Sequence, residues 1–178
     1  MSMEQTYLNV VQKRFKSVKE QGDKTLLQLD NEQLHWAFNE ESNSIAVIVK
    51  HVSGNMLSRW TDFLTTDGEK ETRNRDDEFT DSLQTKEEIM MVWEKGWQVF
   101  LDALLGLKET DLQRYVTIRG ERHSVIDAIE RQMSHYSQHV GQIVFIAKQL
   151  KGSDWQTLSI PKGQSQIFTE SMIKKQQQ

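Results

Sequence analysis

The chain has 178 residues, of which 37% are hydrophobic, 27% charged and 8% aromatic, and its formal net charge is −4. This composition is too apolar for a disordered chain and too polar for one embedded in a membrane, and the length fits one compact domain. Basic residues are dispersed among acidic ones, no apolar run approaches the ~18 residues that cross a bilayer, and cysteine is absent, so we expect a cytoplasmic protein that binds neither nucleic acid nor membranes.

Two long amphipathic helices are predicted in the first half of the chain. Apolar residues at helical spacing from Tyr7 to Val18 predict the first, which we expect to end before Gly22. Asp30 is a candidate N-cap for a short helical turn. The second long helix is predicted from about Ser44 to Leu64, because its apolar residues recur at intervals of three or four.

The middle of the chain predicts a loop, a helix and a small hairpin. Segment 66–79 has many charges and no periodicity, which fits either a solvated connector or a loop whose charges reach over the mouth of a site. A third long helix is predicted over about 85–105, with a glycine directly after it. Residues 115–124 alternate around Gly120 in the manner of a β-hairpin.

The fourth and longest helix is predicted from Ser124 to about Leu150. Beyond it, segment 159–178 contains the only proline and lacks sustained periodicity, so we expect an extended tail, with partial packing through Trp155 and Ile160. Together these elements predict an all-α fold, a bundle of four long helices with a small β-hairpin before the last one. We expect a single domain over residues 1–178, with its core at about 4–158.

Three histidines form the main candidate site. His135 and His139 lie four positions apart, which on a helix places them ~40° apart around the axis and ~6 Å along it. Both project to one side of the apolar face of their helix, and His51 has the same offset on the second long helix. If the two helices are neighbours, the three imidazoles converge, and the sequence therefore predicts a three-histidine site for a divalent metal ion.

The donor set indicates catalytic rather than structural ligation. Three neutral nitrogen donors leave the charge of the ion uncompensated, which favours water or an anion at an open position and lowers the pKa of bound water towards ~7 for zinc. A metalloprotease HExxH motif is excluded, because Tyr136 follows His135. The sequence also has no GxSxG, GxxxxGK or GxGxxG motif.

Polar residues continue the stripe from His51 along its helix. Asn55 and Arg59 are candidate catalytic residues that orient a substrate, with Arg59 suited to an anionic group. An equally weighted alternative is a surface ion pair between Arg59 and Asp62.

The remaining candidates favour structural interpretations. Gln132 and Gln142 flank the histidine pair, where they either contact a ligand or are simply solvated. His35 and His123 have no partner at chelating spacing, and we expect both to be structural. The five tryptophans are expected to fill the core, with one or two available to wall a site cavity.

Several segments resemble the DinB/YfiT-like superfamily and, more narrowly, a Bacillus-type branch of unknown function. They are NSIAVIVKHVSGNMLSRWTDFL, DGEK, RDDEF and QMSHYSQHVGQIVFIAKQL, and the resemblance extends from the first helix to the IPKG segment. Its most specific part is one histidine on the second long helix paired with HxxxH on the fourth. The resemblance implies a four-helix bundle with up-down-down-up connectivity, a three-histidine divalent-metal site and frequent dimerisation. Some relatives are thiol-dependent transferases or isomerases.

Two functional hypotheses follow. The first is a metal-dependent enzyme, either a transferase that uses a small-molecule thiol or a hydrolase, with thiol transfer favoured by the resemblance and by the lack of an obvious general base. The second is a non-catalytic, dimeric metal-binding or stress-related protein. Both predict a homodimer and a divalent cofactor, with zinc or nickel expected before iron or manganese.

Overall fold

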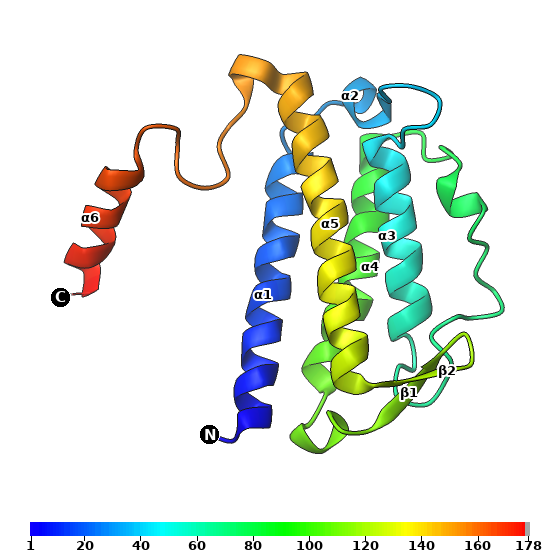
Figure 1. Cartoon of the computed structure of the whole chain (residues 1–178). Coiled ribbons are helices and arrows are strands. Elements are labelled where there is room, and N and C mark those ends of the chain that lie inside the picture. The colour runs from blue at the N-terminus through cyan, green and yellow to red at the C-terminus, as the bar shows by residue number, and fades with distance from the viewer. Residues whose placement is uncertain (177–178) are drawn as a thin grey trace.

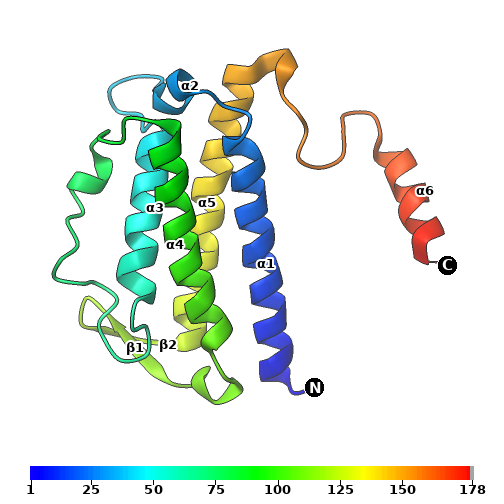
Figure 2. The ribbon, with the colours of Figure 1, turned by 180° about the vertical axis from the view of Figure 1, so that it is seen from behind.

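The computed structural model describes residues 1–176 and is mostly helical, with a two-stranded antiparallel hairpin. Four long helices lie side by side (Figures 1 and 2): α1 (Met3–Leu26), α3 (Ile45–Trp60), α4 (Lys86–Gly106) and α5 (Val125–Lys151). In Figure 1, α1 and α5 run upwards and α3 and α4 run downwards. The shorter helices are α2 (Asn31–His35) and α6 (Ser165–Gln176). In the described part of the chain, no helix has both the length and the apolar character of a membrane span.

Side-chain caps define the starts of the helices. The side chains of Ser44, Thr85 and Ser124 each accept a hydrogen bond from a backbone N–H in the first turn of α3, α4 and α5. Asp30 does the same for α2, where a capping box is complete. The predicted starts of these helices, from Asp30 onwards, are therefore confirmed to within about one residue.

Two predicted helix ends were wrong. The first helix continues past Gly22 to Leu26, because Gly22 lies under the indole of Trp93, where a Cβ would clash, and serves close packing instead of termination. The second ends at Trp60 instead of Leu64, since the chain turns extended at the next residue and then adopts a positive φ.

Aromatic side chains from three helices meet in the core. Phe15 of α1 packs edge-on against Phe100 of α4, with ring centroids 4.5 Å apart, and both rings contact Tyr136 of α5. Trp93 and Trp97 of α4 are fully buried beside them. The expectation that tryptophans fill the core is thus met for part of the set, while Trp36 and Trp155 are only partly covered.

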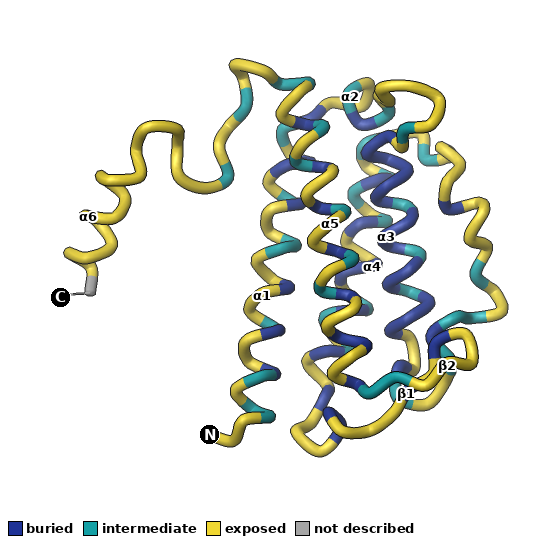
Figure 3. The backbone as a smooth tube through the Cα atoms, viewed as in Figure 1, coloured by how far each residue is buried: buried dark blue, intermediate teal, exposed yellow. Residues whose placement is uncertain are grey.

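Helix α3 is buried on more sides than its neighbours. Figure 3 shows it dark blue over most of its length. It packs mainly on α4, also on α5, and the short 3-10 helix η1 (Asp77–Phe79) covers a further side. Its polar residues are therefore enclosed, which sets the environment of the candidate site.

The predicted hairpin is confirmed and is tied to the preceding loop. Strand β1 (Tyr115–Ile118) pairs antiparallel with β2 (Glu121–Ser124). Arg119 and Gly120 form the turn with φ values of 57° and 75°, the left-handed conformation of a two-residue type I′ connection. The Asp67 carboxylate accepts hydrogen bonds from both backbone N–H groups at 2.8 Å. This contact anchors the loop that leads to η1.

The C-terminal segment differs from the expected extended tail. Residues 165–176 form helix α6, which stands away from the other helices (Figures 1 and 3) and is exposed over residues 165–175. Good helix formers without glycine or proline after Gly163 favour a helix even without an apolar face to bury. Trp155 packs against the core as expected, whereas Ile160 is 38% exposed. Residues 177–178 of the predicted tail lie outside the described part.

Replacing Gly96 with alanine tests how closely α3 and α4 pack, and Gly141 of α5 is the control. A Cβ on Gly96 of α4 would lie 2.8 Å from the Ser53 Cα of α3, whereas one on Gly141 of α5 would meet nothing within 4 Å. We expect Gly96→Ala to lower the free energy of unfolding by about 1–3 kcal/mol through overpacking. Gly141→Ala should raise it by about 0.5–1 kcal/mol, because alanine is the better helix former. Urea unfolding measures both, and equal effects would contradict the close approach.

Candidate metal centre

Three histidines from two helices meet between α3 and α5. His51 comes from α3, and His135 and His139 come from successive turns of α5. One candidate ligand atom of each lies within 4.8 Å of the others. The Nε2 atom of His135 lies 3.3 Å from that of His51 and 3.1 Å from that of His139. The predicted convergence of the two polar stripes is confirmed.

The hydrogen-bond partners leave the Nε2 lone pairs facing one another. His51 donates its Nδ1–H to Glu78 Oε2 at 3.0 Å, and His139 donates its Nδ1–H to Gln142 Oε1 at 2.8 Å. His135 Nδ1 has no partner among the described residues, and with its Nε2 as a third lone pair the cluster requires a cation, because three lone pairs so close repel. Tetrahedral zinc ligands at ~2.05 Å from the ion are ~3.3 Å apart, which is close to the 3.3 and 3.1 Å that separate His135 Nε2 from the other two Nε2 atoms. The donor set therefore fits a divalent ion.

The local electrostatics keep the two imidazoles of α5 neutral, as ligation requires. Burial, reinforced by the neighbouring His139 and His51, lowers the pKa of His135 to about 3. Burial also lowers the pKa of His139, against the opposing effect of the Gln142 hydrogen bond. At neutral pH both rings are therefore uncharged.

A buried ion pair from the charged loop supports the cluster. Glu78, which is 5% exposed, accepts hydrogen bonds from Arg73 Nε at 2.7 Å and Nη2 at 2.8 Å, as well as from His51. Burial alone would raise the pKa of Glu78, but the bonds from Arg73 and His51 outweigh it and hold that pKa below its ordinary value. The carboxylate therefore stays ionised and orients the imidazole, as partners of metal-binding histidines commonly do.

The solvated-connector interpretation of segment 66–79 is therefore wrong for its two most important charges. Sequence analysis missed Glu78 and Arg73, because an acid-rich loop gives no periodicity from which to infer burial. Phe79, the next residue, stacks on the His51 ring with centroids 4.7 Å apart. Gly54 completes the arrangement, since a Cβ there would lie 2.5 Å from the Glu78 Oε1 atom.

Asn55, a predicted catalytic residue, lies one turn beyond His51 and is buried. Its Oδ1 accepts a hydrogen bond from the Tyr136 hydroxyl at 3.0 Å, which in turn accepts one from Trp60 Nε1 at 3.0 Å. These two hydrogen bonds link Asn55, next to the histidine cluster, to the aromatic core. A catalytic role for Asn55 stays a prediction.

Arg59, the second predicted catalytic residue, is only 4% exposed, so the alternative of a surface pair with Asp62 is wrong. Its Nη2 lies 3.7 Å from Glu69 Oε2, and Gly68 packs against the side chain. Burial lowers the pKa of Arg59 to about 10, so it remains charged at neutral pH. Its Nε and Nη1 have no partner among the described residues.

The other candidate residues lie at different places. His35 pairs with Asp81 at 2.9 Å and His123 with Asp127 at 2.6 Å, both outside the cluster. Gln142 bonds to a cluster histidine, as described above, whereas Gln132 is buried and its Oε1 has no partner in the described part of the chain.

Comparison with known proteins places the chain in one uncharacterised group. A family described as "Protein of unknown function (DUF1572)" matches residues 2–164, which covers all four long helices and the hairpin. No curated protein matches the sequence.

Proposed function

The chain belongs to this family, and we propose that it is a divalent-metal-dependent enzyme of the DinB/YfiT-like superfamily. The observation that carries the proposal is the convergence of three imidazole groups, with candidate ligand atoms within 4.8 Å of one another. The directions of α1, α3, α4 and α5 support the up-down-down-up four-helix bundle of that superfamily (Figure 1).

His51, His135 and His139 would hold the ion, for which nitrogen donors favour zinc or nickel, with iron and manganese as the next candidates. A bound divalent ion would act as a Lewis acid that lowers the pKa of a thiol or of water. Histidine ligands contribute no negative charge, so an anionic thiolate is favoured beside them. Glu78 and Gln142 keep His51 and His139 in the tautomer that presents Nε2.

Thiol transfer is favoured over hydrolysis, because the cluster lacks a free base. The nearby carboxylate of Glu78 is already occupied by Arg73 and His51, and its pKa is below the ordinary value. In the transfer we propose, a thiol loses its proton to solvent water, its sulfur bonds to an electrophilic carbon, and the leaving group departs with the electron pair of the broken bond. The unpartnered donors of Arg59 and the amide of Asn55 are proposed to orient substrate.

We further propose a homodimer in the cytoplasm. Exposed apolar side chains on α6, among them Ile167 and Phe168 at 67% and 46% exposure, offer a contact surface.

Elemental analysis of the untagged protein, followed by thiol titration of its cobalt form, tests the proposal. We expect one divalent ion per chain and a sulfur-to-cobalt charge-transfer band that saturates with 2-mercaptoethanol. The matched alcohol, ethylene glycol, should give no such band. A protein that takes up no metal contradicts the proposal. If the metal-loaded protein binds no thiol but hydrolyses activated esters, thiol transfer is refuted and hydrolysis is the reaction of the site.

A further inference from the structure

A pocket of about 670 Å³ lies next to the histidine cluster. Along α5, His135, His139, Gln142, Ile146 and Gln149 follow one another at intervals of four, three, four and three residues, so they share one face of the helix. The first two belong to the cluster and the last three line the pocket. Gln142 belongs to both, since its side chain accepts the hydrogen bond from His139.

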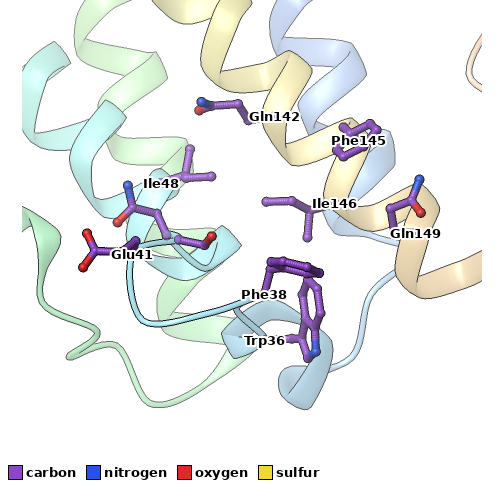
Figure 4. A pocket seen from close by; sticks show the side chains of 10 residues that line it. Trp36, Phe38, Glu41, Ile48, Gln142, Phe145, Ile146 and Gln149 are labelled. Atoms are coloured by element: carbon purple, nitrogen blue, oxygen red, sulfur yellow. The ribbon is translucent and has the colours of Figure 1, made fainter.

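Helix α3, on the other side of the pocket, also contributes to both the pocket and the histidine cluster. Ile48 lines the pocket one turn before His51 on α3, and it faces Ile146 of α5 across the gap (Figure 4). Trp36 and Phe38, from the segment between α2 and α3, close one end. An occupant of the pocket therefore lies within a turn of the proposed metal ligands.

The lining is unusually poor in charge. Its polar members are amides and one hydroxyl, its single charged residue is Glu41, and no lysine or arginine lines it, although 27% of the chain is charged. Phe38 and Trp36 are 77% and 40% exposed, so large aromatic surfaces of the lining are accessible to solvent. Such a pocket binds uncharged aromatic groups and disfavours anions.

We propose that this pocket binds the uncharged aromatic part of a small-molecule substrate and presents its reactive atom to the histidine cluster. The inference rests on the proposed function, because it names the substrate class of the same site. The volume lies within the ~300–1,000 Å³ range of small-molecule pockets. A second copy of the chain is a poorer occupant, because its surface would seal the route to the histidines along Gln142.

Fluorescence of N-phenyl-1-naphthylamine, an uncharged aromatic probe, tests the pocket without any metal. We expect saturable binding that Trp36→Ala and Phe38→Ala each weaken at least about tenfold, through loss of buried aromatic area. Tyr115→Ala, which removes an exposed aromatic side chain of β1 outside the pocket, is the matched control and should change nothing. 2-Naphthylmethanol should displace the probe and 2-naphthoate should not, whereas Glu41→Gln should admit the naphthoate.

Three results would overturn the proposal: equal binding in all variants, equal competition by the alcohol and the carboxylate, or a dimer that Phe38→Ala dissociates while the probe stays unbound.

Thiol binding to the cobalt protein separates this proposal from the proposed function. We expect naphthylmethanethiol to bind at least about tenfold more tightly than 2-mercaptoethanol, and Trp36→Ala to remove the gain. Equal affinities refute only the pocket's role, whereas failure to bind metal refutes the proposed function and leaves only the aromatic-binding part of the inference, which the probe tests separately.

Discussion

Replacing His51 with alanine is expected to lower the affinity for a divalent ion by about 100- to 1000-fold. Structural zinc sites with four ligands have binding free energies of about 10–16 kcal/mol, so one ligand corresponds to about 2.5–4 kcal/mol. Because the His51 imidazole is the only one of the three that α3 supplies, its loss leaves the pair on α5 as a weak chelate. Competition with a chromogenic chelator measures the change in Kd.

The chain carries two matched controls for this experiment. His35→Ala and His123→Ala also remove an imidazole that pairs with a carboxylate, but both lie outside the cluster. We expect their Kd values to equal that of the wild type. If His51→Ala binds the ion as tightly as these controls do, the ion is held elsewhere.

Replacing Glu78 with glutamine is expected to weaken metal binding by about 10- to 100-fold, the usual effect of losing the carboxylate partner of a ligand histidine. The amide carries no negative charge to stabilise the His51 Nδ1–H donor, and it leaves the buried Arg73 with only Glu69, at 3.3 Å, as its ionic partner. The melting temperature should fall as well, because breaking a buried ion pair leaves a charge buried with less compensation. Titration below the melting transition separates the two effects.

Glu71→Gln is the matched control, since Glu71 is an exposed glutamate of the same loop, and it should change neither quantity. In the His51→Ala background, Glu78→Gln should no longer affect the Kd, because the carboxylate acts through that ring. Gly54→Ala provides an independent route, as its Cβ would displace the Glu78 carboxylate. A lower melting temperature with an unchanged Kd would show that Glu78 is purely structural.

Much of the helical fold could be predicted because its signals are local. Ser44, Thr85 and Ser124 cap the helices that follow them, and the spacing of apolar residues predicts helices with correct starts. The exceptions are helix ends and the C-terminal segment: the second helix ends at Trp60, before the predicted Leu64, and residues 165–176 form α6. Gly22 looked like a helix stop, but the indole of Trp93, which lies 71 positions further along the sequence, requires a residue without a side chain there.

The candidate site was predictable in its ligands but not in their surroundings. His135 and His139 share a helix face by spacing alone, and the angular position of His51 matched theirs. The partner of His51, in contrast, comes from a loop without periodicity, 27 positions away. Nothing in the local pattern distinguishes the buried Glu78 from the exposed acids beside it.

The sequence by itself determined the presence of the four long helices, the starts of the last three and the faces on which the three histidines lie, because a helix repeats every 3.6 residues and its geometry follows from short-range order. Only the tertiary structure decided that α3 and α5 are neighbours, that Arg73 and Glu78 fold inward to support His51, and that an apolar pocket continues from the cluster. These features depend on contacts between segments far apart in the chain, and such contacts leave no periodic trace in the sequence.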